Sequence, residues 1–317
     1  MTAIESKDEL LKPLVGQAPR KYEILYLELL MIMYIHIAAL YGIYLAYFSA
    51  TWKTLIFHYI MSQLVTLGIT AGRHRLWSHN SYKAKMPLQI ILVVLSSMTY
   101  QYSVIHWVRD HRLHHRYCDT DADPHNASRG FFFSHIGWLI VKRHPEAMRR
   151  GKAIDISDAL ANPVLRFENK YALPIAVTFS LVLPTLVPMY FFGENLSTAW
   201  HINMTRLMCN LHLTFSINSF VHLSGARSYD KQFSGAQSTF WSILTLGESF
   251  HNYHHTFPWD YRTAELGNNW LNPCTKFIDF FAWLGWAYDL KTVSVDMAQS
   301  RARKTGDGTD KWGFKTK

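Results

Sequence analysis

Long apolar runs alternate with strongly polar segments along the chain. A helix that crosses a bilayer needs about 20 mostly apolar residues. Four segments are long and apolar enough, and they are 24–48, 55–72, 172–192 and 199–221. Very short loops join the first to the second and the third to the fourth, so these spans form two hairpins. The pattern predicts an all-α integral membrane protein with four transmembrane helices.

Basic residues are distributed unevenly around these predicted spans. The two short loops contain only Lys53, whereas the segment 73–170 contains fifteen lysines and arginines. Positive residues concentrate on the cytoplasmic side of membrane proteins. Both termini and the middle segment are therefore predicted to face the cytoplasm. A fifth apolar run, 88–104, is short and would break this arrangement, so we expect a buried or interfacial helix there.

This topology divides the chain into three parts. We expect a cytosolic segment at 1–22, a single membrane-embedded domain at 23–300 and a cytosolic tail at 301–317. The polar start of the chain predicts no cleavable signal peptide. The three cysteines are an odd number without metal-binding spacing, which indicates no disulfide framework. The net charge of +9 suits an anionic membrane face or acidic partners, and we expect no nucleic acid.

Histidines gather in three tight clusters within the polar segments. Eight of the 17 histidines belong to them: His74 and His79; His111, His114 and His115; His251, His254 and His255. Spacings of three and four place the imidazoles of the last two clusters on one helical face. A separation of five is about 140° off register on a regular helix, so the first cluster requires a helix end or a local distortion. The other histidines, His125 among them, are interpreted as satisfied or exposed side chains.

The clusters predict a histidine-rich site for two metal ions in a helical cytosolic cap. Neutral imidazole binds iron, zinc, copper or nickel. Eight nitrogens are too many for one ion, so two ions with four or five ligands each is the natural division. The carboxylate-bridged di-iron site of helical bundles needs a pair of Glu-x-x-His motifs. Only one such motif occurs, from Glu248 to His251, so the predicted site is of a different, histidine-rich kind.

Around these clusters the sequence resembles the membrane acyl-CoA desaturases of the stearoyl-CoA desaturase kind. The matching motifs lie at 74–79, 107–115, 121–126, 130–138 and 247–261. The similarity points to the insect branch, and within it to the Δ11-type enzymes of lepidopteran pheromone glands. The resemblance implies two Fe²⁺ ions. It also adds two residues to the site: His222 as a ninth ligand and Asn218, which would hold a metal-bound water.

The resemblance also implies the reaction. An enzyme of the endoplasmic reticulum membrane would use O2, and two electrons from a separate cytochrome b5, to remove two hydrogens from a fatty acyl-CoA. A methylene has no acidic proton, so a metal-activated oxidant and a dry apolar channel are needed. Carboxylates should orient the imidazoles. The candidates are Asp119, Asp121, Asp123 and Glu248, and the sequence does not pair them with particular histidines.

Substrate-binding residues of the family match five positions here. Arg109, Lys142 and Arg143 match basic residues that meet the CoA phosphates. Trp107 and Thr214 match residues at the bend of the acyl tunnel. The alternative interpretation is a solvated or lipid-facing charge for the basic residues and ordinary core for the other two.

Four further positions concern the shape of that tunnel. Ser62 and Thr66 fall on one face of the second span, where the tunnel would end. Both side chains are small, which favours a deep tunnel. Phe215 replaces a tryptophan beside the tunnel, and Arg73 stands where alanine is usual. No predicted metal ligand is lost, so the chemistry is expected to be intact while a plain Δ9 product is not.

Three other functions remain open from the residues. A fatty acyl hydroxylase or a conjugase would need the same metal site. A metal-binding transporter would place its histidines within the membrane, whereas these clusters lie just beyond the predicted spans. The acyl-CoA desaturase is the function that we expect.

Overall fold

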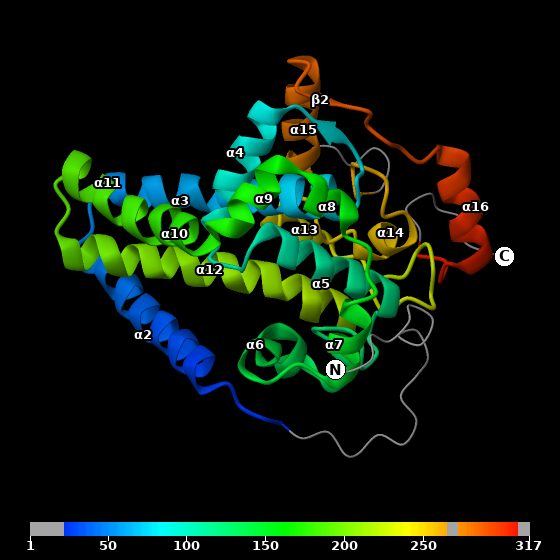
Figure 1. Cartoon of the computed structure of the whole chain (residues 1–317), viewed down its shortest axis with the longest axis horizontal. Coiled ribbons are helices and arrows are strands. Elements are labelled where there is room, and N and C mark those ends of the chain that lie inside the picture. The colour runs from blue at the N-terminus through cyan, green and yellow to red at the C-terminus, as the bar shows by residue number, and fades with distance from the viewer. Residues whose placement is uncertain (1–21, 265–271, 310–317) are drawn as a thin grey trace, which may run out of the picture.

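The structure, a computed structural model, describes residues 22–264 and 272–309. Most of the predicted segment 1–22 therefore lies outside the described residues. The described chain is mostly helical, with one two-stranded sheet. Long helices extend to one end of the molecule, and most of the short helices gather at the other end as a cap (Figure 1).

The first predicted hairpin consists of two long helices. One is α2 (Tyr26–Phe48), and the other is formed by α3 (Trp52–Leu67) and its continuation η1 (Gly68–Ser78), a π-helix. The side chain of Thr51 accepts a hydrogen bond from the N–H of Thr54 and so caps α3. Both long helices are apolar enough to cross a membrane.

The second predicted hairpin is also present. Its first helix, Ala172–Phe192, is apolar and consists of α10 (Ala172–Ala176), η4 (Val177–Val182) and α11 (Leu183–Phe192). Its second is α12 (Leu196–Leu223), which has 28 residues. Within the described ranges, three helices are long and apolar enough to qualify as membrane spans: Tyr26–Phe48, Trp52–Ser78 and Ala172–Phe192. α12 is long but not apolar enough to be among them. Three predicted spans are thus confirmed as long apolar helices, and the fourth only as a long helix.

Buried polar side chains explain why α12 is less apolar. Arg206 is buried and donates to the carbonyl oxygens of Met98, at 3.1 Å, and Ser180, at 2.9 Å. On another face α12 packs closely against α2, where a Cβ added to Gly42 would collide with the carbonyl oxygen of His201. Small residues allow such close approach of two helices. The helix is thus held by neighbours on several sides, and its buried arginine binds carbonyl oxygens of two of them.

The fifth apolar run, 88–104, does not form a single helix. α4 (Met86–Ser97) has 12 residues and ends well before α5 (Val104–Tyr117) begins. A helix of this length extends about 18 Å, which is short of the roughly 30 Å of a bilayer core. As expected, α4 is too short to cross. It packs instead against α3 and η1.

Short elements build the cap around the end of the long helices. They are β1 (Lys83–Ala84), η2 (Ala127–Arg129), η3 (Phe133–Gly137), α6 (Trp138–Ile140), α7 (Pro145–Gly151), α8 (Ser157–Ala161), α9 (Pro163–Lys170), α13 (Thr239–Leu244), α14 (His251–Thr256), α15 (Pro273–Trp283), β2 (Ala287–Tyr288) and α16 (Val295–Thr305). β1 and β2 pair antiparallel, with Lys83 opposite Tyr288. This pairing ties the C-terminal part of the chain to the segment that follows η1. The predicted boundary between residues 300 and 301 falls inside α16, whose buried Ala298 and Ala302 join the hydrophobic core around α14.

Candidate metal centre

The π-helix η1 brings the two histidines of the first cluster together. Hydrogen bonds of a π-helix run between residues five apart, and here the N–H of His79 donates to the carbonyl oxygen of His74 at 3.2 Å. Residues five apart therefore lie on one face, and the centroids of these two rings are 5.0 Å apart. The distortion that the spacing requires is thus present at the exit of the second apolar helix.

Three other elements supply the remaining seven histidines. The side chain of Ser103 caps α5, which fixes where that helix begins. The histidines lie on α5, at the end of α12 and on α14: His111, His114, His115, His222, His251, His254 and His255. The structure therefore brings all nine predicted histidines to one place from four separate elements.

Five of these histidines form a first group: His74, His79, His111, His115 and His254. Their nearest ring nitrogens all lie within 4.8 Å of one another. The Nε2 atom of His254 is 2.9 Å from the Nε2 atoms of both His74 and His115. The Nε2 atoms of His79 and His111 are 2.8 Å apart. The nitrogens thus converge on each other.

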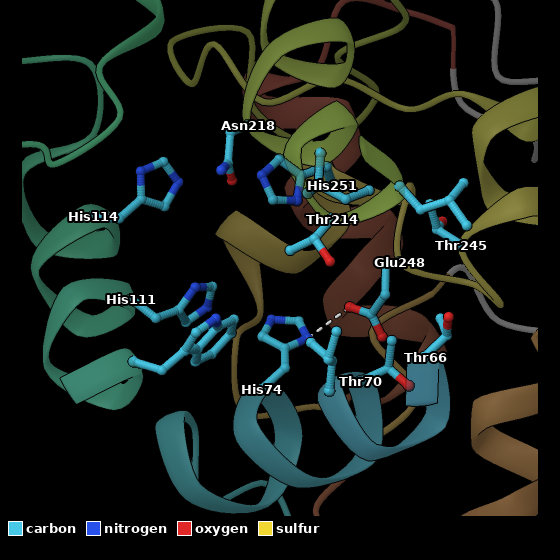
Figure 2. A pocket seen from close by; sticks show the side chains of 14 residues that line it. Thr66, Thr70, His74, His111, His114, Thr214, Asn218, Thr245, Glu248 and His251 are labelled. Carbon is cyan, nitrogen blue, oxygen red and sulfur yellow. Dashed lines mark ion pairs between the residues drawn. The ribbon is translucent and has the colours of Figure 1, made fainter. Parts of the chain in front are cut away.

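The other four form a second group: His114, His222, His251 and His255. The Nε2 atom of His251 lies 2.8 Å from that of His222 and 2.9 Å from that of His255. Asn218 precedes His222 by one turn of α12, and its amide lies between His114 and His251 in Figure 2. Two groups of five and four ligands agree with the predicted division between two ions.

Three carboxylates hold imidazoles of the two groups, and of these Asp123 and Glu248 are buried while Asp119 is partly buried. Asp123 Oδ2 lies 2.8 Å from Nδ1 of His114, and Glu248 Oε2 lies 2.6 Å from Nδ1 of His74. Asp119 Oδ2 lies 3.3 Å from Nδ1 of His222. Each carboxylate favours a proton on Nδ1, which leaves the lone pair of Nε2 free for a metal.

The sequence could not make these pairings, because the partners come from different segments. The fourth candidate carboxylate, Asp121, lies 4.0 Å from Nε2 of His144 through its Oδ2.

The charge state of the imidazoles suits metal binding. Burial holds the pKa of His111, His115, His251, His254 and His255 well below the ordinary value of 6.5, and neighbouring histidines lower it further. Neutral imidazole is the form that binds a metal. Lone pairs that converge in this way repel one another unless a cation lies between them. The donor set therefore fits two divalent transition-metal ions.

Two residues of the centre were missed by the sequence interpretation. Arg75 is fully buried, and its Nη2 donates to Glu248 Oε1 at 2.8 Å, so it fixes the carboxylate that holds His74. His125 was interpreted as an ordinary histidine, yet its Nδ1 lies 3.4 Å from Asp123 Oδ1 and its side chain is buried. Neither residue has a spacing that distinguishes it from a surface residue. The signal that could have found them is their position within two of the matching motifs, at 74–79 and 121–126.

A cavity opens beside the two groups of histidines (Figure 2). Its empty volume is about 630 Å³. Members of both groups line it, together with Trp107, Thr214 and Asn218 on one side and Thr66 and Thr70 on the other. Most of the exposed wall is apolar. We call this space the inner cavity.

A second cavity adjoins the first. Its empty volume is about 1720 Å³, and it extends to Glu28 on α2 and to Leu173 on α10. Trp107, His111, Thr214 and Asn218 line both cavities. We call this space the outer cavity, and these four residues mark its junction with the inner one.

Comparison with known proteins explains this arrangement. The profile described as fatty acid desaturase matches residues 49–270. The chain is 57% identical to the acyl-CoA Delta(11) desaturase of Spodoptera littoralis, over 99% of this chain and 93% of that protein. This chain belongs to the fatty acid desaturase family.

Other members of the family are also similar to this desaturase. It is 54% identical to the (11Z)-hexadec-11-enoyl-CoA conjugase of Bombyx mori, over 93% of this chain and 89% of that protein. It is 45% identical to stearoyl-CoA desaturase 5 of Bos taurus, over 93% and 88% respectively. The similarity therefore extends over nearly the whole chain, the nine histidines included.

Of the residues predicted at the bend and the far end of the desaturase's tunnel, four line a cavity and one, Ser62, lines neither the inner nor the outer one. Trp107 and Thr214 lie at the junction of the cavities, and Phe215 lines the outer one. Thr66 lines the inner cavity. Ser62 lies one turn earlier on α3, and its carbonyl oxygen accepts a hydrogen bond from Thr66 Oγ1 at 2.9 Å. The role of Ser62 at the tunnel end stays a prediction.

The three basic residues predicted to meet CoA have different surroundings. Arg143 forms an ion pair with Asp110, which lines the outer cavity, at 2.5 Å between Nη2 and Oδ2. Lys142 is exposed and pairs with Glu23 at 2.8 Å. Arg109 is half-buried on α5. Of the three, Arg143 is therefore the one tied to a cavity wall, and the role of all three stays a prediction.

Proposed function

We propose that this desaturase introduces a double bond into a fatty acyl chain carried as its CoA thioester. Two hydrogens leave adjacent carbons, and O2 is reduced to two molecules of water. The substrate gives two of the four electrons, and cytochrome b5, a separate protein, gives the other two together with two protons from the solvent. The observation that carries this proposal is the convergence of nine histidines beside an apolar cavity in a chain of this family.

The nine histidines would hold two iron ions, five on one and four on the other, with Asn218 beside the second group. Bound iron supplies the oxidising power that removal of hydrogen from an unactivated methylene requires. The protein's own task is to hold and orient. Glu248, Asp123 and Asp119 keep the imidazoles in position, and the apolar wall of the inner cavity excludes water from the reacting carbons.

The two cavities support a path for the substrate. The acyl chain would pass from the outer cavity through the junction formed by Trp107 and Thr214 into the inner cavity, beside the histidines. Thr66 would limit its length at the far end. The CoA part would remain outside, where Arg109, Lys142 and Arg143 offer positive charge for its phosphates. This path would place a fixed stretch of the acyl chain against the metals.

The position of the new bond is proposed to be carbon 11. The chain is 57% identical to two acyl-CoA Delta(11) desaturases, of Spodoptera littoralis and Choristoneura rosaceana. It is 46% identical to an acyl-CoA Delta-9 desaturase of Acheta domesticus. The difference supports Δ11 over Δ9.

We place the enzyme in the endoplasmic reticulum membrane with four spans, α12 being the fourth. Both termini and the metal centre would face the cytosol, since basic residues concentrate in the segments outside the short loops. The cytosolic surface would then meet the acidic face of cytochrome b5, for which Arg149, Arg150 and Lys152 on α7 and at its end are candidates.

Expression in a desaturase-deficient yeast tests the proposed function. Derivatised GC–MS of the fatty acids should show new alkenes, with the double bond at carbon 11. Hydroxy fatty acids without new alkenes would instead identify a hydroxylase, and they would contradict the proposal.

A conjugase activity is a second candidate, favoured by the similarity to the conjugase of Bombyx mori. Feeding (11Z)-hexadecenoic acid to the same yeast tests it. Conjugated dienes would show that the enzyme also acts on a monounsaturated chain, and their absence would leave desaturation of saturated chains as its activity.

A further inference from the structure

A buried arginine joins the metal centre to the wall of the outer cavity. Arg73 is completely buried on η1 and directly precedes His74, a member of the first group of histidines. Its Nη1 donates to the carbonyl oxygen of Gln101, and its Nη2 donates to that of Tyr102 at 3.1 Å. Both carbonyls belong to the connection between α4 and α5, residues 98–103.

This connection has a backbone that needs external support. Tyr100 has φ 57° and Tyr102 has φ 48°, so two bulky residues adopt the left-handed region that favours glycine. Residues held in such conformations persist when surrounding contacts fix them. The two carbonyl oxygens that Arg73 holds lie at and between these positions. The guanidinium is therefore well placed to maintain the shape of the connection.

A buried carboxylate holds the same connection from its other end. Glu168 on α9 is buried, and its Oε2 accepts a hydrogen bond from the N–H of Val104 at 3.1 Å. The peptide groups between residues 101 and 104 thus lie between a buried positive charge, which binds carbonyl oxygens, and a buried negative charge, which binds an N–H. Hydrogen bonds to charged groups are stronger than those between neutral groups. Arg73 and Glu168 together form a clamp on the connection.

The clamped connection reaches the junction of the two cavities. Gln101 lines the outer cavity, and its Nε2 donates to Oγ1 of Thr214 at 3.3 Å. Thr214 lines both cavities. A continuous path of contacts therefore leads from His74, through Arg73 and Gln101, to the point where the two cavities meet. The covalent bond between residues 73 and 74 fixes the start of this path relative to the metals.

We infer that Arg73 is a positioning residue that fixes the cavity junction relative to the metal centre, and so determines which carbons of the acyl chain are oxidised. The inference rests on the proposed function and extends it to regiochemistry. A substrate bent at the junction is anchored there, and the carbon that meets the metals depends on the distance between the junction and the histidines. A misplacement of about 1 Å can change a rate by about 100-fold, so a small shift of the junction would change the products.

Replacement of Arg73 by methionine tests the inference in the full-length protein. Met fills a similar volume and donates no hydrogen bond. Arg73→Met and the wild type are expressed in the desaturase-deficient yeast, and the ratio of the main positional isomer to its neighbours is measured by derivatised GC–MS. We expect this ratio to fall at least about fivefold. The same ratio, with or without a loss of total product, would overturn the inference.

A second variant covers the case in which Arg73→Met does not accumulate in the membrane. Arg73→Lys keeps the charge and can reach one of the two carbonyl oxygens, so it should shift the isomer ratio in the same direction by a smaller factor. An unchanged ratio in an accumulating Arg73→Lys variant would overturn the inference in that case.

Arg262→Met is the control. Arg262 is a half-buried arginine that donates to the carbonyl oxygen of Val293 at 3.0 Å and pairs with Asp260, and these residues lie outside the connection and outside the linings of the inner and outer cavities. We expect this variant to lower protein abundance while the isomer ratio stays unchanged. An equal shift in Arg262→Met would mean that general loosening changes the products, which also overturns the positioning role. Failure of the wild type to form any alkene would instead contradict the proposed function itself.

Discussion

Nδ1 of His114 lies 2.8 Å from Oδ2 of Asp123, and both side chains are buried. Asp123 also accepts hydrogen bonds from the backbone N–H groups of Asp119 and His125, at 2.8 and 3.1 Å, so its carboxylate is fixed on several sides. The carboxylate thereby fixes the ring of His114, which turns Nε2 toward the second group of histidines.

Asp123→Asn should weaken metal binding. The amide can still accept one hydrogen bond but carries no charge to hold the proton on Nδ1. Loss of such a carboxylate costs about 10- to 100-fold in metal affinity. Iron per chain, measured after purification against a graded chelator, should fall accordingly. Asp289→Asn is the control, because Asp289 is exposed and pairs with Lys83, which is exposed as well. Equal iron retention by Asp123→Asn and the wild type would contradict the orienting role.

The histidine groups predict the pH dependence of the metal-free protein. Burial first, and neighbouring histidines second, keep the pKa of His111, His115, His251, His254 and His255 well below 6.5 in the folded chain. Below pH 6.5 the unfolded chain therefore binds more protons than the folded one, and the free energy of unfolding falls as pH falls. Burial also lowers the pKa of His114, but the charges of Asp123 and Asp119 outweigh burial, so the pKa of His114 is raised overall. The contribution of His114 to the pH dependence therefore has the opposite sign, but the five histidines with lowered pKa values outnumber it.

The melting temperature of the metal-free protein in detergent measures this effect. It should be several degrees lower at pH 5.5 than at pH 7.5. An equal or higher melting temperature at pH 5.5 would mean that the imidazoles are not held neutral by the fold.

Thr66 is predicted to limit the length of the acyl chain. Its side chain is 8% exposed and lines the inner cavity on the side away from α5. Thr66→Phe would fill space at this end, and one methylene is worth about 10-fold or more in discrimination between substrates. The ratio of C14 to C18 products should therefore rise at least about 10-fold. Leu64→Phe adds bulk on an exposed face of the same helix and should keep the ratio. A Thr66→Phe variant with the wild-type chain-length profile would remove this residue from the tunnel end.

Much of this architecture can be predicted from the sequence, because its signals are local. Apolar runs locate the long helices, and spacings of three and four place His111, His114 and His115 on one face. Even the awkward spacing of His74 and His79 indicates a distortion. It does not reveal that the distortion is a π-helix, since that depends on how η1 packs against α4 and α5.

The pairings between distant segments could not be predicted. Glu248 reaches His74 and Arg75 across more than 170 residues of sequence. The left-handed residues Tyr100 and Tyr102 follow from tertiary contacts, because local preference opposes them. The fourth span is predicted from hydropathy alone, and that signal is weak because α12 carries polar side chains such as Arg206, which binds carbonyl oxygens of neighbouring segments.

The metal content of the purified protein tests the central claim most directly. If the groups of five and four histidines each hold an ion, elemental analysis of the wild type should find two iron ions per chain. His115→Ala in the first group and His255→Ala in the second should each reduce that number and abolish double-bond formation while the protein still inserts into the membrane. A single zinc ion per chain with no iron, or two iron ions retained by both variants, would contradict the account.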